Sequence, residues 1–259
     1  MRKVLRLAAA AVAFAFVTGA ALAAMDPVKV AAAKKAGDDF VALAAGSDKS
    51  GQVPRQTDPK VKALLDTVFD RAALGATVLP MNESGKVGEL LSNANRIGFV
   101  YMLGGTGLSD LGKLGEDQKA MEQAERNIGT FAPEIGRWFD YQMAIQGAVA
   151  DATIAFLATA KKNVMDNPQV KAGLGEVRGG LAASLRGVLQ MMASDTLDDG
   201  WRRDRLPGLG ELAPKAAKLV SAEDAASLKD SATQLAAALN DPALKAGLTA
   251  FGEAVARRP

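Results

Sequence analysis

The segment at residues 133–161, PEIGRWFDYQMAIQGAVADATIAFLATAK, is the feature that most constrains how this chain folds. No proline interrupts it, and its large apolar side chains recur every three or four residues, which is the spacing of a helical face. As an α-helix it would be roughly 44 Å long, about the length of a whole domain. Its second half is rich in alanine and apolar on nearly every side, as is typical of a buried helix. The pattern therefore predicts a long central apolar helix enclosed by other helices.

Four helix starts share one short signal, in which an Asp or Asn directly precedes a proline. The side-chain oxygen can accept a backbone N–H of the first turn, and proline lacks only an N–H that would have had no partner there. The pairs are Asp26-Pro27, Asp58-Pro59, Asn167-Pro168 and Asp241-Pro242. Three of them continue alike, as DPKVKALL, NPQVKAGL and DPALKAGL. Their unequal separations favour repeated use of a good helix opening over a regular internal repeat.

Apolar residues at helical spacing predict the remaining elements. The cleanest stripe covers 168–193, although Gly179-Gly180 could break that helix, and Ser221 with Asp224 resembles a capping box. The expected helices are 27–45, 59–74, 82–103, 116–128, 133–161, 168–193, 209–220, 222–239 and 242–256. No segment alternates with a period of two for long, so strand content should be near zero. We predict an all-α fold, a single-domain multi-helix bundle of about eight helices around 133–161.

The first residues have the pattern of a secretory signal peptide. A basic start is followed by a short apolar run, and Ala21 and Ala23 supply the small side chains that precede a cleavage site. We predict a signal peptide at 1–23 with cleavage near Ala23, and a protein exported to the periplasm or beyond; an uncleaved membrane anchor is the alternative. The expected domains are then an N-terminal helix and linker at 24–57 and a helical bundle domain at 58–259. Whether the first helix packs on the bundle is left open.

The charge balance and cysteine content of the chain argue against some classes of binding partner. The chain has 31 basic and 29 acidic residues and no cysteine. Removing the three basic residues of the signal leaves 28 against 29, a balance that argues against nucleic acid, whose binders carry clustered positive charge. The absence of cysteine excludes disulfides and a lipid-modified cysteine. We therefore expect a soluble protein with no nucleic-acid partner and no stable membrane span after signal cleavage.

The chain also contains no histidine. Without histidine or cysteine it cannot form Ser-His-Asp or Cys-His catalytic groups, or zinc and haem sites built on those ligands. The Gly-rich segment at 104–107 lacks the third glycine and the strand–helix context of a dinucleotide-binding loop. We accordingly predict no cofactor, no metal and no catalytic residue.

Carboxylates are the chemistry that remains, because two of them can hydrolyse a glycosidic bond without metal or histidine. Asp140 and Asp151 lie on the predicted central helix about 16 Å apart along its axis, too far to act as one pair. Each would need a partner on another helix, such as Glu89 or Glu176. The structural alternative for Asp151 is a half-buried carboxylate bonded to a neighbouring helix.

Two clusters that mix aromatic and charged residues are candidate binding sites, because Trp, Tyr and Arg are enriched at binding hot spots. The first is at the start of the central helix, where all but the tryptophan could lie on a polar face. The second is the run from Asp198 to Arg205, within a predicted loop at 195–208. With the carboxylate of Asp151 they give the candidate residues Arg137, Trp138, Asp140, Tyr141, Asp151, Trp201, Arg202 and Arg203. For the first cluster, the structural alternative is an ordinary first helical turn. For the second, it is a tryptophan that closes the core, with its charged neighbours paired locally.

Three functions are weighed from these features, and two lead. A membrane-associated helical protein that uses residues 143–160 ranks last, because Gln146 and the charged Asp151 lie in the middle of that segment. The first leading function is a non-enzymatic exported protein that binds an envelope protein or a small apolar ligand between its helices. The alternative is a carboxylate-dependent hydrolase acting on cell-wall saccharide. A cleft lined by acidic side chains against the central helix would favour the hydrolase, and an apolar cavity between helices would favour the binding protein.

Overall fold

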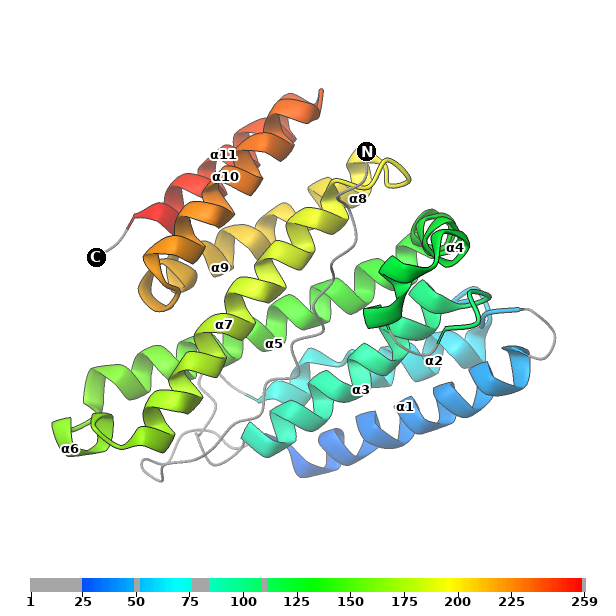
Figure 1. Ribbon diagram of the computed structural model, residues 1–259. Coiled ribbons are helices and arrows are strands. Elements are labelled where there is room, and N and C mark those ends of the chain that lie inside the picture. Colours follow the sequence, from blue (N-terminus) through cyan, green and yellow to red (C-terminus); the bar gives the residue numbers. More distant parts are fainter. Residues whose placement is uncertain (1–24, 49–51, 76–83, 109–110, 258–259) are drawn as a thin grey trace.

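The computed structural model describes residues 25–48, 52–75, 84–108 and 111–257, and these ranges are helical with no strand (Figure 1). The predicted all-α class is therefore confirmed, whereas the predicted signal peptide lies outside the described residues. The α-helices are α1 (Pro27–Asp48), α2 (Pro59–Val68), α3 (Ser84–Leu103), α4 (Gln118–Thr130), α5 (Ala132–Thr159), α6 (Lys162–Met165), α7 (Pro168–Met192), α8 (Asp199–Arg203), α9 (Leu206–Leu219), α10 (Ala222–Ala238) and α11 (Pro242–Ala256). Two 3₁₀ turns, η1 (Arg71–Leu74) and η3 (Leu111–Glu116), lie among them.

All four Asp/Asn-Pro helix starts are confirmed. The side chain of Asp26 accepts the N–H of Val28, and those of Asp58, Asn167 and Asp241 cap α2, α7 and α11 in the same way. Ser221 accepts the N–H of Asp224 at the start of α10, as its sequence predicted. These caps satisfy backbone donors that a helix cannot satisfy internally, so they determine where each helix begins.

Some boundaries differ from those predicted. α7 continues unbroken through Gly179-Gly180, and a Cβ added at Gly179 would meet no neighbouring atom within 4 Å. The predicted loop at 195–208 contains the one-turn helix α8 and the start of α9, because Asp198 caps α8 by accepting the N–H of Trp201. The described chain thus has more helical segments than the eight expected, and α6 and α8 account for part of the difference.

The helices pack in two groups that both contact α5 (Figure 1). On one side α1, α2 and α3 pack together, and α3 contacts α5. On the other side α7 and α9 contact α5 directly, while α10 and α11 form a hairpin against α7 and α9. The first helix is therefore packed on α2 and α3, which answers the question that the sequence left open.

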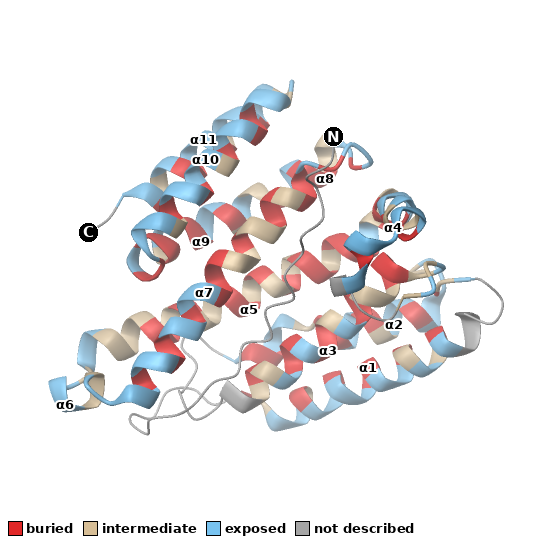
Figure 2. Ribbon diagram, viewed as in Figure 1, coloured by how far each residue is buried: buried red, intermediate tan, exposed pale blue. Residues whose placement is uncertain are grey.

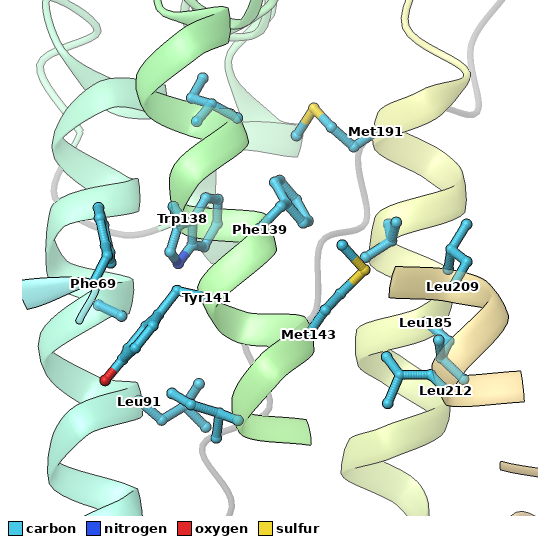
Figure 3. Packing of buried hydrophobic residues seen from close by; sticks show 14 of the residues in the cluster. Phe69, Leu91, Trp138, Phe139, Tyr141, Met143, Leu185, Met191, Leu209 and Leu212 are labelled. Atoms are coloured by element: carbon cyan, nitrogen blue, oxygen red, sulfur yellow. The ribbon is translucent and has the colours of Figure 1, made fainter. Parts of the chain in front are cut away.

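Buried residues concentrate along the first half of α5 and along the faces of the helices that meet it, whereas α6 and the end of α5 are half-buried or exposed (Figure 2). Tyr141 points from α5 toward Phe69, and Met143 points the other way, toward Leu209 and Leu212 (Figure 3). A helix that presents apolar side chains in both directions joins the two groups into one hydrophobic core.

Among the described helices, none combines the length and the apolar character that crossing a membrane requires.

Candidate functional site

Two hollows lined by described residues are large enough to hold a small molecule, and they differ in chemistry. The first, which we call the apolar groove, has a volume of about 510 Å³ and lies between α1, α3 and the segments 52–54 and 104–108. The second, the acidic cleft, has a volume of about 420 Å³ and lies between α5, η1 and α9. Both volumes fall in the range usual for small-molecule sites, roughly 300–1,000 Å³.

The apolar groove is lined almost entirely by aliphatic and aromatic side chains. Among its described lining residues only one carries a charge, the arginine at position 96. Most of the apolar lining side chains are half-buried rather than buried, so their surface is accessible from the groove. The principal apolar residues that line the groove, whether half-buried or buried, are Val41, Val53, Phe99, Val100, Leu103 and Leu108.

The acidic cleft gathers charged side chains from three elements. They are Arg71, Asp140, Asp151, Asp204, Glu211 and Lys215. Four carboxylates therefore face one hollow, although no three acidic side chains of the described chain are grouped so as to hold a metal ion. Glu89 and Glu176, the partners suggested by the sequence, do not line the cleft and are exposed on α3 and α7. That suggestion was wrong because a helical stripe does not specify which neighbouring helix will face it.

Asp140 is the most perturbed carboxylate of the cleft. Burial raises its pKa above the usual aspartate value, and the nearby charge of Asp204 adds to this effect. The guanidinium of Arg205 opposes it, because Nη2 donates a hydrogen bond of 3.0 Å to Asp140 Oδ2. Asp140 is thus a partly desolvated carboxylate held against a cation, a setting in which a proton is retained to higher pH than in water.

Asp151 occupies the other end of the cleft and is also paired. Lys215 of α9 donates to its Oδ2 over 2.6 Å, and both side chains remain partly exposed. This contact is the structural alternative stated from the sequence, a half-buried carboxylate bonded to a neighbouring helix. Exposed or half-exposed pairs of this kind contribute little stability, typically 0–1 kcal/mol.

The two aromatic and charged clusters meet through Arg205, which the candidate list did not contain. Its guanidinium lies 4.3 Å above the Trp201 ring and bonds the Trp201 carbonyl while it pairs with Asp140. Trp201 Nε1 in turn donates to the carbonyl of Ala132 at the start of α5. The start of α5 can approach α8 this closely because residue 136 is glycine, where a Cβ would lie 2.2 Å from Arg205 Nη2.

The neighbouring arginines have separate structural partners. Arg202 is buried and donates to the carbonyls of Met192 and Ser194 at the end of α7 and to Asp199. Arg203 is half-exposed and pairs with Asp241 over 2.5 Å, which ties α8 to the start of α11. Neither side chain lines the apolar groove or the acidic cleft.

The first cluster is divided between the surface and the core. Arg137 lies near the surface and donates a hydrogen bond to Asp66. The hydrogen bond that Asp66 accepts from Lys62 has the larger effect on its pKa, and together with the one from Arg137 it holds that pKa below its usual value. Trp138 is buried, and its Nε1 donates to Asn95. Tyr141 is buried beside Phe69, and burial raises the pKa of its hydroxyl. The expectation that Tyr141 lies on a polar face was wrong, because α5 is covered on two sides and not one.

No family model matches this chain. Searches among curated proteins and among solved structures gave no match either.

Sequence reasoning missed one buried charged residue, Glu134, and placed Arg205 in the second cluster without selecting it as a site residue. Glu134 is fully buried in the first turn of α5, where its Oε1 accepts hydrogen bonds from Arg55 Nε and from the N–H of Gln56. Arg55 also lies over the Phe131 ring at 4.9 Å. A local signal existed for Glu134, since an acid in a first helical turn is favoured by the helix dipole, but nothing local indicated its burial.

Proposed function

We propose that this chain is an exported, non-enzymatic helical protein that binds a small apolar ligand in the apolar groove. The observation that carries the proposal is a hollow of about 510 Å³ whose lining is apolar apart from Arg96 and Gln52 among the described residues. An apolar ligand placed there would remove its own surface and that of the groove from water, at about 25 cal/mol for each Å² buried. An envelope protein that inserts an apolar side chain into the groove is the alternative partner.

The architecture supports the same function. In this proposal α5 acts as the central helix, and the core that it shares with both helix groups keeps α1 and α3 in place. The groove then lies on a rigid support at one edge of the core and does not need to form when the ligand arrives. A site formed in advance loses less conformational entropy on binding.

Substitution of Val41 tests this proposal. Val41→Gln places an amide against any apolar ligand in the groove, and we expect the dissociation constant of the fluorescent apolar probe N-phenyl-1-naphthylamine to rise about tenfold, since an unpaired buried amide costs about 1–3 kcal/mol. The matched control is Val28→Gln on the same helix, because Val28 is 74% exposed and does not line the groove. Fluorescence titration of the purified protein measures both. Equal affinities in the two variants and the original protein would exclude the groove as the binding site.

The acidic cleft supports a second function, a carboxylate-dependent hydrolase acting on cell-wall saccharide. The specific observation is that Asp140, whose pKa is raised, shares the cleft with Asp204 and Glu211 from the facing segment. A carboxyl group with a raised pKa and a second carboxylate nearby are the groups that such a reaction uses. This function ranks second because Arg205 and Lys215 already occupy Asp140 and Asp151.

The hydrolase is tested by incubating the protein with purified peptidoglycan. Release of soluble saccharide fragments by the original protein, with a loss of at least a hundredfold in Glu211→Gln, would support it, since one acid–base group contributes about 10²–10⁴ in rate. Glu211 is exposed and makes no ion pair among the described residues, so its replacement leaves the fold intact. If no fragments are released under conditions in which the apolar probe binds, the hydrolase function is excluded and the binding function remains.

A further inference from the structure

Arg96 stands at one end of the apolar groove and differs from every other described lining residue in carrying a charge. It shares a face of α3 with Phe99, Val100 and Leu103, which follow it at three, four and seven residues. Along the helix axis Leu103 lies roughly 10 Å from Arg96, at 1.5 Å per residue. The wall that α3 presents to the groove is therefore cationic at one end and apolar along the rest.

The present partner of Arg96 leaves most of its guanidinium available. Nη1 donates to Asp38 Oδ1 of α1 over 2.8 Å, and the two side chains are 46% and 54% exposed. No other hydrogen bond joins this guanidinium to a described residue, although the group has five donors. Asp38 does not line the groove. Since an exposed ion pair of this kind contributes little to stability, it competes only weakly with a ligand.

We propose that the ligand of the groove is an amphiphilic monocarboxylate, with its carboxylate on Arg96 and its aliphatic chain along Phe99, Val100 and Leu103. This inference rests on the proposed function, because it names the class of molecule that the same groove binds. The planar guanidinium matches a carboxylate in geometry and can bind it with two hydrogen bonds. A single arginine that already faces Asp38 suits one negative charge, whereas a doubly charged phosphate would require more cations.

The test compares two probes that share one chain and differ at the head. Decanoate and decan-1-ol are each titrated below the concentration at which they aggregate, by displacement of N-phenyl-1-naphthylamine. We expect the original protein to bind decanoate at least tenfold more tightly than the alcohol. In Arg96→Gln this preference should fall to less than twofold through loss of decanoate affinity alone. Asp38→Asn should strengthen decanoate binding and leave the alcohol unchanged, because it removes the competing carboxylate.

The matched control is Arg186→Gln. Arg186 forms an ion pair of the same geometry with Asp224, with Nη1 donating to Oδ1 over 2.8 Å, far from the groove on α7 and α10. Its replacement should change neither affinity. Equal affinities for the two probes in the original protein would overturn the carboxylate proposal while leaving the apolar site in place. Binding of neither probe would overturn both, as expected if another part of the chain or a protein partner fills the groove.

Discussion

Replacing the buried Arg202 by leucine is expected to lower the free energy of unfolding by about 3 kcal/mol. The guanidinium is only 8% exposed and donates to the carbonyls of Met192 and Ser194 over 2.8 Å each. The last carbonyls of a helix have no partner within it, so these bonds complete the end of α7. Leucine has a comparable apolar volume but no donor. The Met192 carbonyl would lose its side-chain donor, whereas the Ser194 carbonyl would keep the N–H of Leu197 at 3.3 Å. A buried carbonyl left without a donor costs about 1–3 kcal/mol, and the lost charge-assisted bond to Ser194 adds to this cost.

Arg203→Leu is the matched control for this prediction. Arg203 follows directly in the chain, yet its side chain is 51% exposed and its single ion partner is Asp241. We expect a loss below about 1 kcal/mol, as for other exposed ion pairs. Urea unfolding followed by far-ultraviolet circular dichroism measures both variants. Losses of equal size would mean that Arg202 contributes as a charge and not as a cap for α7.

The second large effect concerns Gly98, at the contact between α3 and α5. A Cβ at this position would lie 2.3 Å from the Trp138 ring, which is buried and packed against Phe99 and Phe139. The ring also donates from Nε1 to Asn95, so it has little freedom to move away. We expect Gly98→Ala to lower the free energy of unfolding by about 1–3 kcal/mol, the usual cost of an overpacked core.

Gly88→Ala on the same helix should have the opposite sign. No atom lies within 4 Å of a Cβ built at Gly88, so alanine fits without displacement. Because alanine favours a helix interior over glycine, this variant should be more stable by about 0.5–1 kcal/mol. Thermal and urea unfolding of the two variants test the pair together. A gain in stability from Gly98→Ala would contradict the close approach of α3 and α5 at this contact.

The glycines illustrate what local sequence can and cannot convey. Glycine recurs within the helices, but its frequency alone does not tell which of these positions lie at a close helix contact. The structure places Gly98 and Gly136 at such contacts, whereas Gly88 and Gly179 face open space. We therefore expect alanine to lower stability at Gly98 and to raise it at Gly88. The difference arises because the side chain that approaches a glycine comes from another helix.

The candidate site also has features that the sequence indicated and features that it did not. The sequence drew attention to Asp140, Asp151 and Trp201, and the structure places each of them in a specific contact between helices. It placed Arg205 in the same loop cluster as Trp201 but did not indicate that this arginine joins Trp201 to Asp140. It also did not indicate the apolar groove, whose walls come from separate helices. The carboxylate partners that the sequence suggested on α3 and α7 do not line the acidic cleft. The element that faces α5 across the cleft is the segment from Asp204 to Lys215.

The sequence by itself determined the helical class, the capped helix starts and the continuous apolar faces, since each depends on residues within about one helical turn of one another. Only the tertiary structure decided which faces meet. Asp140 and Arg205 are 65 residues apart, and Arg55 and Glu134 are 79 apart. Apolar faces attract one another without regard to identity, so helix packing selects these partners through shape and buried charge, which no local pattern records.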